Sequence, residues 1–444
     1  MEISLSILIN YFIAVFFIKR KILFFQSLKI YYIDFFLYII YNIGRKNILH
    51  KEYDMEIRYG NDKDKIKAEY IWKECFTDSE NEVEFYFNEL YKKENFLLME
   101  DRENEIRASL HENPYEMIMN NEKFSSFYII AVAVSPQYRG RGYMGELIRY
   151  SLRNAREKEL DFVFLSPINT EIYRKYGFGY MSSLERYSIS MEYISFDRID
   201  REYEIKKVSD KKNLYGDLTK IYKEKMKDSF AYLERNENYY RRALKEMENE
   251  NGDIYIFYME NKPAGYISLY KREGSIEIRE LFGLDKKVIE SIYAFIKTYK
   301  EYYPEVIIKA PINSNLNFHI HNQKSMEKIE FPFIMGRIVN VENMLKRLHI
   351  EDMELKISVI DKIIEENNGI YEISVYGVVS KKDKKKSIES DIEIDIADLN
   401  HLIFGYFSIN EMIELERIKI NNKEKIEEIK KIFPKRKVYL QEYQ

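Results

Sequence analysis

A glycine-bearing turn between an apolar stretch and an amphipathic stretch is the feature of this sequence with the clearest chemical meaning. Residues 128–135 read YIIAVAVS, and residues 137–142 read QYRGRG. Strand, glycine turn and helix in this order can present backbone N–H groups to a phosphate. Gly140 and Gly142 would let the main chain approach a diphosphate closely. The helix is predicted from apolar residues at helical spacing, namely Met144, Leu147, Ile148, Leu152 and Ala155.

A second pattern follows this predicted helix. Residues 161–166 read DFVFLS and predict the next strand, which Pro167 ends. Residues 169–180 read NTEIYRKYGFGY. Asn169 or Thr170 can cap a short helix there, and Gly177 can end it. Tyr173 lies within this helix, so it is either a reactive phenol or one more packed ring among 39 tyrosines.

Together these two patterns resemble one branch of a known enzyme class. The order Gln137-x-x-Gly140-x-Gly142 resembles the coenzyme A pyrophosphate loop of the GNAT N-acetyltransferases. It is unlike a dinucleotide fingerprint, which needs a wider glycine spacing. The string from Ile172 to Phe178 resembles the enhanced intracellular survival (Eis-like) family of GNAT enzymes. The resemblance covers residues 55 to 444 in order. It implies an α+β protein with two fused GNAT folds, each a mixed, mostly antiparallel sheet flanked by helices, followed by a sterol-carrier-protein-like α/β domain.

The resemblance also implies an activity, an acetyl-coenzyme A-dependent N-acetyltransferase. The acceptor would be a primary amine of a small polyamine-like or aminoglycoside-like molecule, or of a protein lysine. Such a reaction needs a polarised thioester oxygen, a base for the ammonium proton and an acid for the departing thiolate. The resemblance assigns the acid to Tyr173 and the base to the free α-carboxylate of the last residue, Gln444. The side chain of Glu442 and an ordered water remain alternative bases.

The expected contacts to acetyl-coenzyme A come from the strand, the turn, the helix start and the next loop. No metal is expected as a cofactor. The coenzyme A contacts are expected from Val132, Ala133, Val134, Gln137, Arg139, Gly140, Arg141, Gly142, Tyr143, Met144, Gly145, Ile168 and Asn169.

Composition limits the class of protein further. A chain of 444 residues suggests about three domains. Its 70 Lys and Arg nearly balance 74 Asp and Glu, so no basic field indicates nucleic acid as a partner. Cys75 is the only cysteine, which excludes an internal disulfide and a thiolate zinc cluster and fits a reducing cytoplasm. His319 and His321 stand at strand spacing, but two imidazoles without a third ligand predict a polar strand face more than a metal site.

The first 54 residues form an apolar extension with two readings. Residues 3–18 and 22–43 are mostly apolar and flank Lys19, Arg20 and Lys21, so they could form a membrane anchor or hairpin. They lack the features of a secretory signal. Alternatively, Met55 is the true start of the protein, because Glu56-Ile57-Arg58 can begin the first strand directly. We favour the second reading.

The rest of the chain is expected to divide into three segments. Residues 55–198 would form the catalytic GNAT domain, residues 199–335 a degenerate second GNAT domain, and residues 336–444 the sterol-carrier-like domain. The second segment repeats the order of elements but has no Gln-x-x-Gly-x-Gly, so it should not bind coenzyme A. In the third segment, the turn at 367–371 and the Phe433-Pro434 tail support the resemblance.

Two further expectations concern the tail and the partners. Val438-Tyr439-Leu440 and Tyr443 are too apolar for a frayed chain end, so the tail should be docked. The resemblance implies a homo-oligomer, possibly a hexamer. A competing function from another class is a non-catalytic protein whose third segment binds an apolar ligand while the GNAT segments act as scaffold. The glycine turn argues against it, because a scaffold needs no phosphate cradle.

Overall fold

The structure is a computed structural model that describes residues 55–196, 198–209, 214–312, 314, 316–382 and 389–443. The apolar extension 1–54 and the expected base Gln444 lie outside these residues. Residues 57–99 and the described residues from Ile106 onward form one compact unit. No helix in the described ranges has both the length and the apolar character to cross a membrane. Residues 55–198, 199–335 and 336–444 are called here the first, second and third segments.

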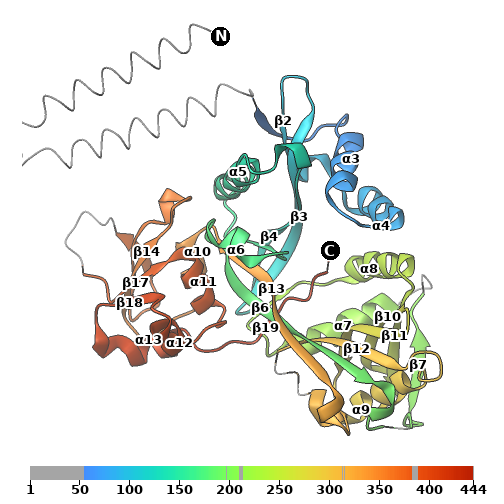
Figure 1. Cartoon of the computed structure of the whole chain (residues 1–444). Helices are drawn as coiled ribbons and strands as arrows, with labels where there is room; N and C mark the ends of the chain where they lie inside the picture. The colour runs from blue at the N-terminus through green and yellow to red at the C-terminus, as the bar shows by residue number, and fades with distance from the viewer. Residues whose placement is uncertain are drawn as a thin grey trace, which may run out of the picture. The chain divides into compact units, whose positions relative to one another are not determined.

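The first two segments share a single sheet (Figure 1). Among the described residues it has 14 strands, in the order β1-β2-β3-β4-β5-β13-β6-β12-β11-β10-β9-β7, with β8 and β19 off this path. Most neighbouring strands are antiparallel, and helices flank the sheet, which confirms the predicted α+β class. The elements of the first segment are β1 (Glu56–Tyr59), α3 (Lys65–Cys75), α4 (Glu80–Phe85), β2 (Phe96–Glu100), β3 (Ile106–Met119), β4 (Glu122–Val134), α5 (Tyr143–Glu157), β5 (Phe162–Leu165), α6 (Thr170–Arg174) and β6 (Gly179–Ser190).

The second segment repeats the order of elements of the first, and one of its strands, β13, is inserted among the strands of the first segment. Strand β13 lies between β5 and β6, so a strand far along the chain completes the first segment's part of the sheet. Strand β6 pairs on its other side with β12. The boundary expected at 335/336 falls inside β13. The second segment's elements are β7 (Tyr203–Lys207), α7 (Leu214–Met226), β8 (Ala231–Leu233), α8 (Glu237–Asn249), β9 (Gly252–Met259), β10 (Lys262–Arg272), β11 (Ser275–Gly283), α9 (Lys286–Lys297), β12 (Glu305–Pro311) and β13 (Glu327–Ile338).

The third segment has its own five-stranded sheet, in the order β16-β15-β14-β17-β18. A buried ion pair ties it to β13 of the larger sheet: Arg337 at the end of β13 donates from Nη2 to both carboxylate oxygens of Asp361 at 2.7 Å and from Nε to the carbonyl of Tyr176 at 2.9 Å. The elements are α10 (Val341–Lys346), β14 (Leu355–Ile360), β15 (Gly369–Ile373), β16 (Val379–Lys382), β17 (Ile392–Asp395), α11 (Ile396–Ile403), α12 (Ile409–Glu414), β18 (Ile418–Ile420), α13 (Ile426–Ile432) and β19 (Val438–Tyr439).

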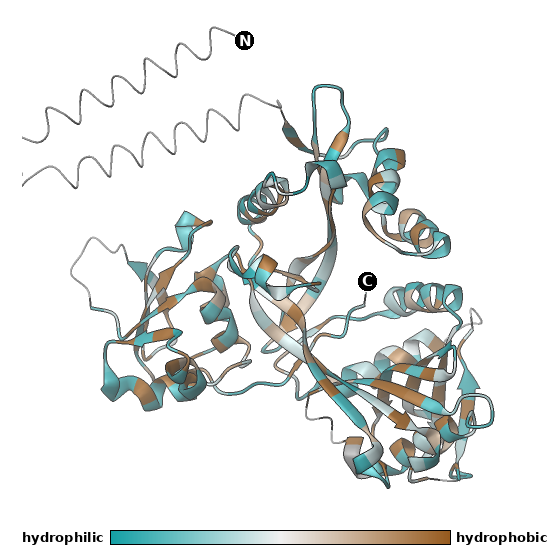
Figure 2. Cartoon of the chain, in the orientation of Figure 1, coloured by the Kyte–Doolittle hydropathy of each residue, from teal (hydrophilic) through white to brown (hydrophobic). Residues whose placement is uncertain are grey.

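Helix α5 shows why the glycine turn is held in place. As the spacing predicts, Leu147, Ile148, Leu152 and Ala155 are buried, while Met144 at the first turn is only partly buried. In Figure 2, hydrophobic residues are concentrated on the strands and recur along the helices that cover them. Burial of one apolar stripe therefore fixes α5 against the sheet and leaves its N-terminus at the end of β4.

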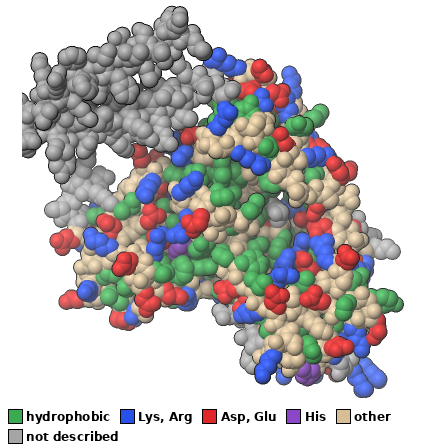
Figure 3. All heavy atoms as spheres, in the orientation of Figure 1, with side chains coloured by type: hydrophobic (Ala, Val, Ile, Leu, Met, Phe, Trp, Pro, Cys, Tyr) green, Lys and Arg blue, Asp and Glu red, His purple; other side chains and the backbone are tan. Residues whose placement is uncertain are grey.

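Two expectations about charge and histidine meet the structure here. Acidic and basic side chains are interspersed over the face shown in Figure 3, as the near-neutral composition implies. The strand predicted around His319 and His321 is wrong, because His319 ends a short 3₁₀ helix, Leu316–His319. Within the described residues, no group of three or more His, Cys, Asp or Glu is placed to hold a metal ion.

Candidate active site

A fork in the sheet lies beside the glycine turn. Strands β4 and β5 are parallel and pair only from Phe127↔Val163 to Ile129↔Leu165. Strand β4 then continues to Val134, paired on its other side with β3. Beyond Ile129, the edge of β4 that faces β5 therefore has no ladder partner in the described sheet. A fork of this kind leaves main-chain N–H and C=O groups free to bind an extended ligand.

A bulge sits at the start of the unpaired stretch. Ser109 of β3 lies opposite Ala133 and His111 lies opposite Ile130, so two residues of β4, Ala131 and Val132, face one residue of β3. Ala131 has φ 46°, in the left-handed region that alanine rarely adopts. Bulges re-aim the backbone, often next to functional sites. The expected contact residues Val132, Ala133 and Val134 follow directly on this re-aimed backbone.

The turn after β4 forms a cradle at the N-terminus of α5. Gly142 is the N-cap residue at φ 90°, and no side chain caps the helix. The first-turn N–H groups are therefore available to an anion, and the helix dipole favours negative charge there. Gly140 also has a positive φ, 79°, and a Cβ built at either glycine would meet open space. These features fit a diphosphate, as the sequence motif predicts.

The residues expected to contact the cofactor around the cradle differ in their contacts and in their exposure. Arg139 donates from Nε to the carbonyl of Val134 at 3.1 Å, which ties the turn to the strand end. The guanidinium of Arg141 lies 5.1 Å from the ring centre of Tyr138. Gly145 is buried, and a Cβ there would lie 2.6 Å from the hydroxyl of Tyr176, so its lack of a side chain serves helix packing. Ile168 is 91% exposed. Cofactor contacts by all these residues remain predictions.

Tyr173 is held on the short helix α6. The side chain of Asn169 caps this helix by accepting from the N–H of Glu171. The ring of Tyr173 is buried and packs edge-on against Phe178, with ring centres 6.0 Å apart. Its hydroxyl makes no hydrogen bond with any described residue. Burial raises the pKa of Tyr173 to about 12, so the phenol keeps its proton at neutral pH and has one to give.

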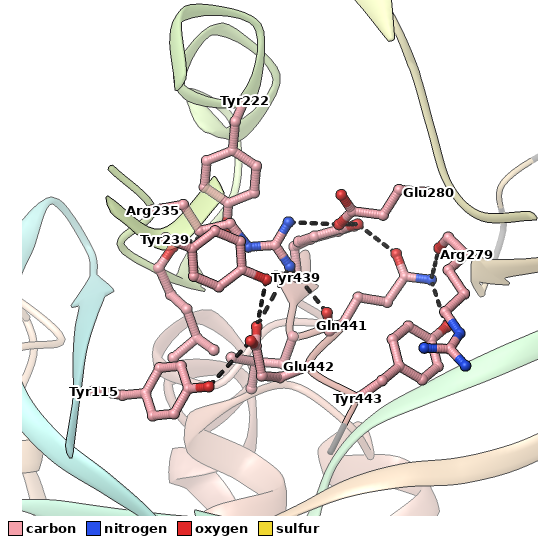
Figure 4. Close-up of polar contacts among 12 residues, drawn as sticks. Tyr115, Tyr222, Arg235, Tyr239, Arg279, Glu280, Tyr439, Gln441, Glu442 and Tyr443 are labelled. Carbon is pink, nitrogen blue, oxygen red and sulfur yellow. Dashed lines mark hydrogen bonds and ion pairs between the residues drawn. The ribbon is translucent and has the colours of Figure 1, made fainter. Parts of the chain in front are cut away.

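The C-terminal tail is docked, as its apolar residues predict (Figure 4). Strand β19 pairs in parallel with β8, and β8 pairs with β3 of the first segment. Gln441 and Glu442, beyond β19, are only 4% and 5% exposed. The tail is therefore buried at Gln441 and Glu442, close to the end of the described residues.

Gln441 bridges a second fork in the sheet. Strands β11 and β12 pair only from Ser275↔Glu305 to Ile278↔Ile308 and then separate. The side-chain amide of Gln441 donates to the carbonyl of Arg279 on β11 and to the carbonyl of Lys309 on β12, both at 3.2 Å. The tail itself thus satisfies backbone groups that the separation of these strands leaves unpaired.

Glu442 is anchored at the first fork. The hydroxyl of Tyr128, next to the last paired residue of β4, donates to the main-chain oxygen of Glu442 at 3.3 Å. The Glu442 carboxylate accepts from Tyr115 at 3.1 Å and from Tyr239 at 3.0 Å. Arg235 lies 3.5 Å away. Burial raises the pKa of the Glu442 carboxyl. Because both carboxylate oxygens are engaged, this side chain serves as an anchor and is poorly placed as the alternative base.

Two residues near the site escape detection from the sequence. His111 lies opposite Ile130, but burial lowers its pKa to about 3 and aromatic rings such as Trp72 and Tyr86 surround it, so it is no base. Glu246 of α8 lines a small cavity of about 70 Å³ together with Glu442. Burial, and then the charge of Glu442, raise the pKa of Glu246 to about 7. Only the fold brings these residues to the site, so no local sequence signal marks them.

Comparison with known families agrees with this geometry. Models described as GNAT acetyltransferase domains match residues 56–181 and residues 231–338. A sterol carrier protein domain model matches residues 341–441. No curated protein sequence matches the chain.

Solved structures share the fold over most of the chain. A GCN5-related N-acetyltransferase from Anabaena variabilis is 21% identical, with a TM-score of 0.72, over 86% of this chain and 99% of that one. A probable N-acyltransferase from Enterococcus faecalis is 17% identical, with a TM-score of 0.74, over 86% and 97%. Eis1 from Mycobacterium abscessus is 14% identical, with a TM-score of 0.70, over 88% and 100%.

The fold, the cradle and these matches define an acyltransferase of the GNAT class. GNAT domains in general use acetyl-coenzyme A. Within that class the chain is Eis-like in fold and domain order, with two GNAT domains followed by a sterol carrier protein domain.

Proposed function

We propose that this protein transfers the acetyl group of acetyl-coenzyme A to a primary amine, using the first segment alone for the cofactor. The observation that carries the proposal is the uncapped, glycine-lined N-terminus of α5 beside the fork of β4 and β5. Acetyl-coenzyme A would supply an activated thioester there. The second segment lacks this cradle, because the side chain of Asp285 caps α9 and puts a carboxylate where a diphosphate would lie.

The roles of the chain's own groups follow from their places. Free N–H groups beyond the bulge at Ala131 would polarise the thioester oxygen and stabilise the oxyanion as the amine attacks. Tyr173 would donate its hydroxyl proton to the departing thiolate. The α-carboxylate of Gln444 would take the proton from the ammonium group. Supporting this, the docked tail brings the chain to the first fork at Glu442.

The acceptor class rests on the family resemblance. A small polyamine-like or aminoglycoside-like amine, or a protein lysine, is the proposed acceptor. A screen that follows coenzyme A release with spermidine, an aminoglycoside and a lysine peptide would rank these classes. The alternative, a scaffold whose sterol-carrier-like segment binds an apolar ligand, predicts no amine-dependent release with any of them.

The test of the proposed base compares two tags. An N-terminally tagged enzyme should turn over normally, whereas a C-terminal tag should cripple turnover because an amide replaces the carboxylate. Gln444→Ala should stay active, since the carboxylate keeps its place. Deleting Gln444 moves the carboxylate by up to about 3.5 Å, out of hydrogen-bond reach, and should also inactivate. Equal activity of both tagged enzymes would place the base elsewhere.

A further inference from the structure

A cavity of about 780 Å³, lined by residues of all three segments, is not used by the proposed reaction. It opens where β11 and β12 separate, with Leu281 and Phe282 on one side and Ala310 on the other. Tail residues 435–439 and Gln441 form another wall. A volume of this size is typical of a site for a small organic molecule.

The cavity is not a second coenzyme A site. Asp285 accepts from the N–H of Val288 at 3.0 Å and so closes the start of α9 with a carboxylate. A Cβ at Gly283 would lie 2.4 Å from Ile289, so this glycine allows α9 to pack closely. A diphosphate would therefore meet the negative charge of Asp285 at the start of α9. The start of α5 in the first segment offers it free N–H groups instead.

The lining of the cavity combines apolar walls with positive charge. Apolar side chains come from both strands and from two helices, and none of the described lining residues is Asp or Glu. Basic side chains, in contrast, are frequent along the same walls. The apolar group includes Met226, Leu281, Phe282, Ile289, Ile308 and Ala310, and the basic group includes Lys225, Lys309, Lys435, Arg436 and Lys437.

Two of these ammonium groups, those of Lys225 and Lys437, have no carboxylate partner among the described residues. Lys225 of α7 is half-buried, and its Nζ donates to the carbonyl of Gly283, the last residue of β11, at 3.0 Å. Burial, and then the nearby charge of Lys437, lower the pKa of Lys225. Lys309 and Lys435 differ, because they pair with Glu277 and Glu411. An anion bound between the two ammonium groups would offset both their mutual repulsion and the desolvation of Lys225.

We propose that this cavity binds an anionic amphiphile, with the carboxylate or phosphate head at Lys225 and Lys437 and the acyl chain along the apolar walls between β11, β12 and α9. The head would neutralise two cations that the protein leaves unpaired. The chain would remove apolar side chains of the cavity from water. This site is separate from the cradle at α5, and its ligand takes no part in acetyl transfer.

The test uses the full-length protein and three probes with the same chain. Calorimetry should show dodecanoate binding at one site per chain, and dodecyl phosphate should compete with it, whereas dodecanol should bind much more weakly. The ratio of the two anion affinities tells a carboxylate site from a phosphate site. Dodecanol binding as tightly as dodecanoate would overturn the proposal, and so would the absence of saturable binding.

Variants locate the ligand. Lys225→Met should weaken dodecanoate binding by about ten- to a hundredfold, because it removes a charged hydrogen-bond donor. Lys223→Met is the matched control, an exposed lysine on the same helix, and should bind as the parent does. Ala310→Phe should block the cavity. Both Lys225→Met and Lys223→Met should keep the parent's acetyl transfer rate.

Two results would refute the assignment to this cavity. One is unchanged dodecanoate affinity in Lys225→Met. The other is full displacement of dodecanoate by excess acetyl-coenzyme A, which would put the amphiphile in the first segment. Either result leaves the proposed acetyl transfer intact, since that activity is measured separately by coenzyme A release.

Discussion

Replacing Gln441 by Ala tests whether the tail is positioned by the second fork. The Gln441 amide makes two hydrogen bonds of 3.2 Å to the carbonyls of Arg279 and Lys309, and the residue is 4% exposed. Each buried bond contributes about 1 kcal/mol net, so their loss weakens tail docking by about 2 kcal/mol. Such a change shifts the ratio of docked to undocked tail about thirtyfold.

The assay is steady-state coenzyme A release by an N-terminally tagged enzyme. If the docked tail supplies the base, kcat of Gln441→Ala should fall by more than twofold and at most about thirtyfold, with KM for acetyl-coenzyme A unchanged, because the cradle lies on other elements. Gln441→Glu should fall further, since its carboxylate would face two carbonyl oxygens. Lys431→Ala, an exposed lysine of α13 just before the tail, is the control. A folded Gln441→Ala variant within twofold of the parent would refute the reasoning.

Four further outcomes are expected. Tyr173→Phe keeps the buried ring and removes the proton, so turnover should drop about a hundredfold or more with cofactor affinity retained; a variant as fast as the parent would make Tyr173 a packing residue. Gly142→Asp should abolish acetyl-coenzyme A binding in calorimetry, because it strains a φ of 90° and sets a carboxylate against the diphosphate. Glu246→Gln should raise the melting temperature more at pH 8 than at pH 5. The Glu246 carboxyl of the parent has its pKa raised to about 7, so the parent loses stability as pH rises from about 4.5 towards 7. An equal gain in melting temperature at both pH values would contradict this. Light scattering at micromolar concentration should give the mass of a symmetric oligomer, and a monomer mass would oppose the resemblance.

Some of this arrangement is readable from the sequence because its cause is local. The glycines at 140 and 142 and the apolar stripe of α5 are set by neighbours within a few residues, so the turn and the helix match the prediction. The insertion of β13 between β5 and β6 is not readable, because a strand's partner depends on the whole sheet. The sequence likewise gives no sign that His111 lies opposite Ile130, since one bulge shifts that register.

The docked tail also has a consequence for the order in which the protein folds. Tyr115 and Glu442 touch across 327 positions of sequence, and the strands between them must be in place first. Closing so long a loop is an entropic cost that only the finished sheet repays. We therefore expect tail docking to come late in folding, after β3 and β8, which flank the tail, have paired. If the proposed base at Gln444 is correct, acetyl transfer in a refolding experiment should return only when the tail has docked, later than the helical signal.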